Sequence, residues 1–189
     1  MAHQTLIDGT KYSVTGGKSM VSGTSYSISL GKTKIDGVTY DISFKPQPYA
    51  MLYTDGSMVF QYGNTVEEGK TLSSRFRGFI NQSFSRWEAP WYYNAGKIKT
   101  ISFNNISTKS IGGWFFDFRN LTTIDYNGLN LDDITNMSLT YYNCYNLITS
   151  PICGNKVTSL YETYYNCYNL TGSPVCGDNV IDMCRTYYN

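Results

Sequence analysis

The sequence predicts a mainly β protein with short helical or 3-10 turns, in which an N-terminal β-hairpin repeat module precedes a solenoid of stacked coils. A 14-residue period runs through the first 44 residues, and a 23-residue period fills the last third of the chain. The composition agrees, because 18 Tyr and 17 Gly among 189 residues favour short strands and turns over long helices.

The first repeat defines a module over residues 1–44. Three segments share an apolar residue, a turn ending in Gly and a following strand pattern: Ile7-Asp8-Gly9-Thr10, Val21-Ser22-Gly23-Thr24 and Ile35-Asp36-Gly37-Val38. Each is followed by Tyr-x-Val or Tyr-x-Ile, which has the strand period of two, so each unit predicts two short strands joined by a tight turn. A module this small has little core, so we expect it to need a partner copy, a larger assembly or the next domain.

Residues 45–49 predict a linker, because Lys45-Pro46-Gln47-Pro48 cannot continue a central strand. Further on, Trp87 to Tyr93 predicts a short helical or turn element that leads into a strand from Lys97 to Phe103. We expect the aromatic residues of this element to cover the open end of the solenoid core, and the alternative is that they hold a ligand.

The second repeat occupies residues 114–189. Tyr141-Tyr142-Asn143-Cys144 returns 23 residues later as Tyr164-Tyr165-Asn166-Cys167, and a degenerate copy around Phe115 precedes them by 26 residues. Periods of this length, with apolar residues at regular positions, indicate coils that stack on a shared core.

Each coil predicts one buried face and one exposed face. Leu160, Tyr164, Cys167 and Leu170 are spaced four, three and three residues apart, which places them together in the core. The neighbouring face would carry a surface ladder of six residues: Tyr142, Tyr145, Tyr165, Tyr168, Asn166 and Asn169. Such a ladder can stack against sugar rings, anchor a protein partner, or form without any ligand.

The composition argues against several functional classes. Fifteen basic and fourteen acidic residues leave a net charge of +1, which is too little for a nucleic-acid binder. The lone histidine, His3, leaves little room for catalysis by histidine, so we expect no enzyme, no catalytic residue and no cofactor. The first residues lack the pattern of a secretion signal and no apolar run is long enough for a membrane span, so neither is expected.

Metal and paired-carboxylate chemistry is also not expected. The five cysteines form no Cys-x-x-Cys motif, so we predict no metal site and interpret them as buried, reduced thiols. The pairs Glu67-Glu68 and Asp132-Asp133 are adjacent and point apart in most geometries, whereas glycoside hydrolysis needs opposed carboxyl groups.

Residues from about 50 to the end resemble the BspA-like leucine-rich-repeat family of bacterial and phage surface proteins. The resemblance lies in Tyr53-x-Asp55-Gly56-x-x-x-Phe60-x-Tyr62, in Lys97 to Phe103, and in coils with an aromatic residue, Cys and Leu at spacing three. It implies a leucine-rich-repeat solenoid whose N-terminal cap spans residues 50–113 and whose coils span 114–189.

The repeats of residues 1–44 are similar to short modules that open virion structural proteins of phages infecting gut Firmicutes. This similarity implies a virion structural protein of tail, collar or head-fibre type, assembled in the host cytoplasm. Residues 1–44 would join other virion proteins, as part of a homo-oligomer, and the repeats would contact a host-surface glycan or protein. The alternatives are a bacterial cell-surface adhesin and a tail-associated glycan hydrolase.

Overall fold

The structure is a computed structural model that divides the chain into two compact units, Met1–Lys45 and Pro46–Asn189. It describes the backbone of four strands in the first unit and residues 47–149, 153–172 and 176–188 of the second.

The first unit contains two antiparallel hairpins. Their strands are β1 (His3–Ile7), β2 (Thr10–Val14), β3 (Gly31–Ile35) and β4 (Val38–Ile42). β1 pairs with β2 in the same register in which β3 pairs with β4, so that Ile7 lies opposite Thr10 and Ile35 opposite Val38. The first and third copies of the 14-residue repeat therefore form equivalent hairpins. The second copy, around Gly23, lies outside the described residues.

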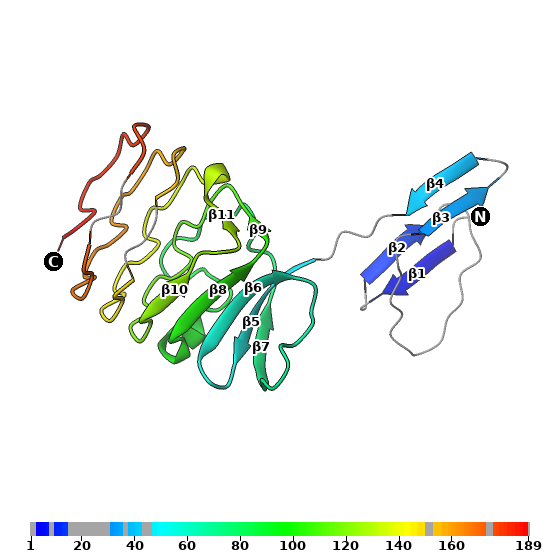
Figure 1. Cartoon of the computed structure of the whole chain (residues 1–189), viewed down its shortest axis with the longest axis horizontal. Helices are drawn as coiled ribbons and strands as arrows, with labels where there is room; N and C mark the ends of the chain where they lie inside the picture. Colours follow the sequence, from blue (N-terminus) through cyan, green and yellow to red (C-terminus); the bar gives the residue numbers. More distant parts are fainter. Residues whose placement is uncertain are drawn as a thin grey trace. The chain divides into compact units, whose positions relative to one another are not determined.

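The second unit is built on a mixed five-stranded sheet with the order β10-β8-β6-β5-β7 (Figure 1). Its strands are β5 (Pro48–Tyr53), β6 (Ser57–Tyr62), β7 (Leu72–Phe76), β8 (Thr100–Asn104) and β10 (Thr123–Asp125). β5 is antiparallel to both β6 and β7, whereas β8 is parallel to β6 and β10.

A tight turn at Asp55-Gly56 makes the first pair of this sheet antiparallel. Asp55 Oδ1 accepts hydrogen bonds from the backbone N–H and the hydroxyl of Ser57, at 2.8 and 2.6 Å. Gly56 has a φ of +88°, and a Cβ at this position would lie 2.7 Å from the Lys97 carbonyl oxygen. The turn therefore requires glycine, both for its conformation and for the close approach.

The remaining regular elements of this unit are short. β9 (Ile106–Ser107) and β11 (Leu129–Asn130) form a two-residue parallel pair. The two 3-10 helices are η1 (Tyr92–Lys97) and η2 (Leu131–Asp133). The described chain is thus mainly β with few helices.

The prediction of a capped leucine-rich-repeat solenoid is wrong, because the main element of the fold is the mixed sheet with its antiparallel hairpin. Beyond β11, strand pairing within the described residues is reduced to isolated parallel bridges that link Ser110, Asn136, Ser159 and Asp182 in turn. The physical reason is local, because the coils contain pairs of residues of left-handed conformation four positions apart, and this conformation interrupts a strand.

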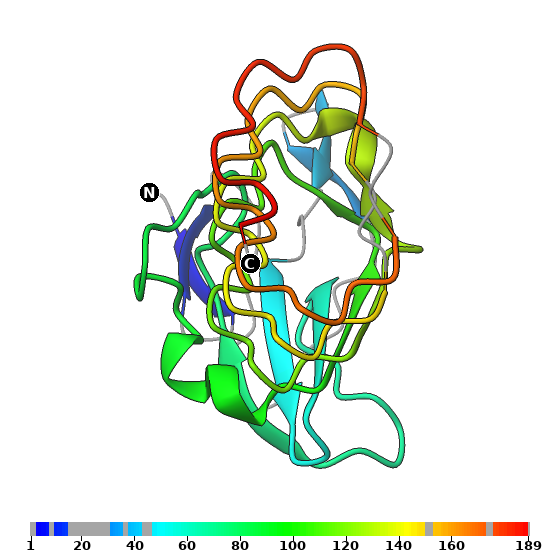
Figure 2. The same cartoon turned by 90° about the vertical axis from the view of Figure 1, so that its left-hand side faces the viewer.

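The repeats nevertheless lie over one another, as Figure 2 shows along their common axis. We call residues 110–188 the repeat stack. Side chains of each coil donate hydrogen bonds to the coil before it: the Thr163 hydroxyl donates to the Met137 carbonyl at 2.8 Å, and the Thr186 hydroxyl to the Leu160 carbonyl at 2.8 Å. Because these hydroxyls are buried, the bonds hold neighbouring coils in register.

Apolar side chains from the sheet and the repeat stack form one main core. It begins with aromatic rings around Phe60 and continues through Phe115 and Tyr141 to Tyr164. Trp91 lies in this core and its indole N–H donates to the Trp114 carbonyl at 2.6 Å. The expected covering of the core by the aromatics of residues 87–93 thus holds for Trp91, whereas Trp87 and Tyr93 are exposed.

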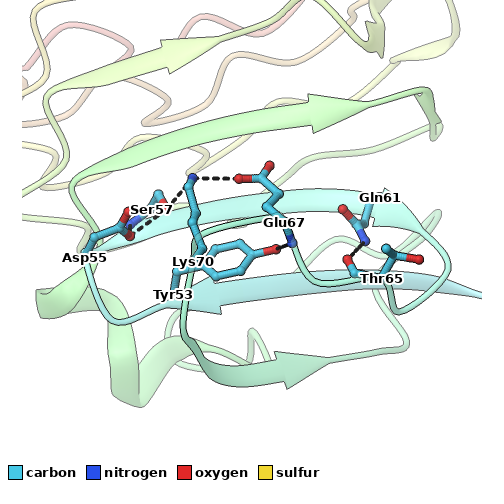
Figure 3. A network of polar contacts seen from close by, with 7 residues as sticks. All are labelled: Tyr53, Asp55, Ser57, Gln61, Thr65, Glu67 and Lys70. Atoms are coloured by element: carbon cyan, nitrogen blue, oxygen red, sulfur yellow. Dashed lines mark hydrogen bonds and ion pairs between the residues drawn. The ribbon is translucent and has the colours of Figure 1, made fainter.

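A second, smaller core lies on the other face of the sheet, where four residues are buried: Tyr49, Met51, Tyr53 and Val59. A polar network ties the β6–β7 connection to this face (Figure 3). The Glu67 N–H donates to the Tyr53 hydroxyl at 3.1 Å, and Lys70 Nζ lies 2.7 Å from the Glu67 carboxylate and 3.0 Å from the Ser57 hydroxyl. Glu67 therefore stabilises the fold here.

Candidate functional site

Two turns with left-handed residues shape the exposed face of each coil. One turn has its left-handed residue at Leu139, Glu162 and Arg185, and the other at Asp117, Asn143 and Asn166. Asn and Asp adopt this conformation more readily than other residues, which explains the recurring Asn of the second turn. The tyrosine before each Asn faces outward and the cysteine after it is buried.

The outward tyrosines form a stacked column with a neighbouring pair beside it, and together we call these rings the tyrosine ladder. The column contains Phe116, Tyr142, Tyr165 and Tyr188, with successive ring centroids 4.9, 4.6 and 5.0 Å apart and interplanar angles of 12°, 8° and 13°. The pair consists of Tyr145 and Tyr168, whose centroids are 5.6 Å apart at 19°.

This stacking determines what the tyrosine ladder can offer to a ligand. The faces of Tyr142 and Tyr165 contact neighbouring rings, so no sugar ring can enter between them at 4.6 Å. Tyr142 and Tyr165 are half-buried and Tyr168 is exposed, so ring edges and hydroxyl groups meet the solvent. The column is therefore a row of hydrogen-bonding groups on a rigid apolar support.

The asparagines predicted for the ladder support the tyrosines from within. Asn166 Nδ2 donates to Asn143 Oδ1 at 2.9 Å, and Asn166 Oδ1 accepts a hydrogen bond from the Tyr168 hydroxyl at 2.9 Å. Asn169 Nδ2 donates to the Tyr145 carbonyl of the preceding coil at 2.7 Å. The bonds of Asn166 to Asn143 and of Asn169 to Tyr145 join neighbouring coils, and the bond to Tyr168 holds a ring of the ladder. Together they help to fix the spacing of the rings.

A charged cluster that sequence reasoning missed borders the ladder. The carboxylate of Glu162 is 2% exposed and accepts hydrogen bonds from Arg86 at 3.0 Å, Arg185 at 3.3 Å and the Tyr161 hydroxyl at 3.1 Å. The guanidinium of Arg86 also lies 5.0 Å from the centre of the Tyr142 ring. Arg86 comes from the segment before η1, 76 residues away in sequence, so no local pattern could reveal the pairing.

Trp87, the residue after Arg86, is strained and exposed. It has a φ of 72°, a conformation that bulky side chains rarely adopt, and its side chain is 64% exposed. An exposed indole held on a strained backbone is typical of binding surfaces rather than of cores. Its positive φ is not visible in the sequence.

Two ionisable groups at the ladder, Tyr142 and Arg119, have shifted pKa values. Burial raises the pKa of Tyr142, an effect that the positive charge of Arg86 partly opposes. The ion pair with Asp117 raises the pKa of Arg119, whose guanidinium lies 5.8 Å from the centre of the Tyr145 ring. The raised pKa keeps the Tyr142 hydroxyl protonated at neutral pH, so it can both donate and accept hydrogen bonds.

A recess of about 310 Å³ adjoins Tyr168. The residues that line it are Tyr164, Cys167, Tyr168, Leu170, Thr171, Gly172 and Tyr187. The buried hydroxyl of Tyr164 has no hydrogen-bond partner among the described residues. Tyr168 of the ladder therefore forms part of the lining of this recess.

The cysteines are arranged for packing. Burial raises the pKa of Cys144 well above its ordinary value and that of Cys167 to about 12, which keeps both thiols protonated. Cys144, Cys153 and Cys167 are buried, as expected, but Cys184 is exposed and Cys176 half-buried. Within the described residues, no group of His, Cys, Asp or Glu side chains is arranged to hold a metal ion.

Comparison with known proteins gives no match: no family model, no curated protein and no solved structure matches the chain. In the parts of the chain that the structure describes, no helix has the length and apolar character needed to cross a membrane. The resemblances found in the sequence therefore stay predictions.

Proposed function

We infer that the protein is an attachment protein without catalytic activity, which binds an extended surface ligand along the tyrosine ladder. The observation that carries this inference is the column from Phe116 to Tyr188, whose rings repeat every 4.6–5.0 Å and whose three tyrosines are half-buried or exposed. A repeating row of identical groups suits a ligand that repeats as well, and a polymer on a cell surface is such a ligand.

The physical case is that the ladder is ordered before the ligand arrives. Tyrosine gives a large contact area with a polar tip and only two side-chain torsions. Stacking on both sides and the bonds of Asn166 and Asn169 already restrict those torsions. Binding therefore costs little side-chain entropy, and several weak contacts along the column add up to a useful affinity.

The setting that we favour is a phage virion. Residues 1–44 would join the protein to other virion proteins as an oligomer, and the second unit would present the ladder to a host-surface glycan or protein. The hairpin repeats support this division of roles, because β1–β2 and β3–β4 are two-stranded and a two-stranded hairpin is marginal without a partner.

Two experiments test these proposals. The first measures binding of the full chain to bacterial cells and compares Tyr142→Phe/Tyr165→Phe with Tyr62→Phe at the end of β6. The ladder variant keeps the stacked rings but loses two hydroxyls, so its binding should fall at least tenfold while the control binds normally. Equal binding by both variants would refute the ladder as the site.

The second experiment locates the protein in an induced culture by immunogold electron microscopy. Gold on phage particles supports the virion role and shows whether the protein lies on head, collar or tail. Gold confined to cell walls contradicts that role and favours the bacterial adhesin.

A further inference from the structure

The charged cluster beside the ladder has a surplus of positive charge. Two guanidinium groups, those of Arg86 and Arg185, share the single carboxylate of Glu162. Their side chains are 47% and 61% exposed, so each keeps N–H donors that face the solvent. The cluster therefore carries a net charge of +1 at the surface, and an anionic group could bind it without displacing Glu162.

This surplus charge lies next to the row of tyrosine hydroxyls. Arg86 contacts the Tyr142 ring, and the N–H of Tyr188, the last ring of the column, donates to the Arg185 carbonyl at 3.3 Å. A third arginine near the ladder, Arg119, is neutralised by Asp117 at 3.0 Å. The surplus positive charge therefore comes from Arg86 and Arg185.

Trp87 adds an aromatic ring that is exposed to solvent. It follows Arg86 directly and keeps a conformation that costs free energy in a bulky residue. A planar ring beside a guanidinium can hold a ligand ring next to a bound acid group.

The spacing of the ladder distinguishes between classes of ligand. An extended peptide advances about 3.3–3.4 Å per residue, so its side chains on one face recur about every 6.7 Å. The rings of the ladder repeat every 4.6–5.0 Å in the column and lie 5.6 Å apart in the pair, so a peptide would lose register after one step. A chain of linked sugar rings carries hydroxyl groups on every residue, so it can meet a tyrosine hydroxyl without the two-residue repeat that limits an extended peptide.

We propose that the ligand of the tyrosine ladder is an acidic polysaccharide. Its hydroxyls bind the tyrosine tips, its acid groups bind Arg86 and Arg185, and one of its rings stacks on Trp87. This inference rests on the proposed function, because it names the chemical class of the ligand for the same surface. Carboxylate and phosphate groups share the required chemistry, so the test includes both.

The test uses isothermal titration of the full chain with matched probes: an oligogalacturonate, its methyl ester and a phosphate-bearing mannan oligomer. The methyl ester has the same sugar backbone without the charges. Arg185→Gln removes one exposed guanidinium while Arg86 still pairs with Glu162, and Arg75→Gln on β7 is the matched control.

We expect at least one acidic probe to bind about tenfold more tightly than the methyl ester, and Arg185→Gln to abolish that difference. The better of the two acidic probes identifies the acid group. Arg75→Gln should bind like the natural chain.

Three results would overturn the proposal. If the acid and the ester bind equally, or if Arg185→Gln leaves binding of the acid unchanged, the acid group plays no part in binding. The ladder would then be a site for neutral glycans. Tighter binding of a polyglutamate peptide would indicate a protein partner. If no probe binds while cells still do, the ligand is not an acidic polysaccharide, whereas loss of cell binding as well would refute the proposed function itself.

Discussion

The buried carboxylate of Glu162 predicts a strong coupling between the two arginines that flank it. Arg185→Met should cost about 0.5–1 kcal/mol of unfolding free energy, because Arg86 and the Tyr161 hydroxyl still compensate the charge. Arg86→Met should cost about 1–2 kcal/mol, since it also removes the contact with Tyr142. The double variant leaves a carboxylate that is 2% exposed with no cation, and its cost should reach about 3–5 kcal/mol.

Urea unfolding of the full chain, followed by tryptophan fluorescence, measures these values. All three tryptophans lie in the second unit, and Trp91 and Trp114 are buried, so the signal reports on the unit that contains the cluster. The coupling energy should be about 1 kcal/mol or more. Adding Glu162→Gln to the double variant should restore stability, because a neutral amide needs no counter-charge. Costs that add within about 0.5 kcal/mol would refute the argument.

Three further predictions concern the repeat stack. Thr163→Val should cost about 1–1.5 kcal/mol and Thr158→Val less than about 0.5 kcal/mol in the same urea assay, because both hydroxyls bond the preceding coil but only Thr163 is buried; equal costs would contradict the role given to burial. Alkylation at pH 8, read by mass spectrometry of peptides, should modify the exposed Cys184 quickly and the buried Cys167, whose pKa is raised to about 12, only after unfolding; early modification of Cys167 would indicate that the coils open. Burial raises the pKa of Tyr141 well above 10.0, so above that pH the unfolded chain binds fewer protons than the folded one. The free energy of unfolding should therefore fall by up to about 1.4 kcal/mol per pH unit for each buried tyrosine. Melting temperatures that stay constant from pH 9 to 11 would contradict this.

The sequence allowed the neighbours within the repeats to be predicted, because a fixed period brings equivalent residues together. Tyr142 and Tyr165 are 23 residues apart and their rings stack. Their role in binding stays a prediction. The mixed sheet could not be predicted in the same way, since the repeats dominated the pattern and the Asp55-Gly56 turn, which makes β5 and β6 antiparallel, occurs once.

The charged cluster was beyond the reach of the sequence for a different reason. Arg86 and Glu162 are 76 residues apart and belong to no common repeat. Glu162 occupies the left-handed turn position that Leu139 and Arg185 occupy in the neighbouring coils. The only signal in the sequence was an acidic residue at a turn position that holds Leu and Arg in the neighbouring coils. That signal does not identify the residue with which Glu162 pairs.

The hydroxyl bonds between coils have a consequence for how such a protein can change. The hydroxyls of Thr163 and Thr186 each donate a hydrogen bond to the coil before, so equivalent residues join each pair of neighbouring coils. Duplication or deletion of the gene segment that encodes one 23-residue unit would therefore lengthen or shorten the row of tyrosines by one step. The hydrogen bonds between the other coils would stay the same. The length of the ladder can thus change by one coil at a time without any change in the residues of the core.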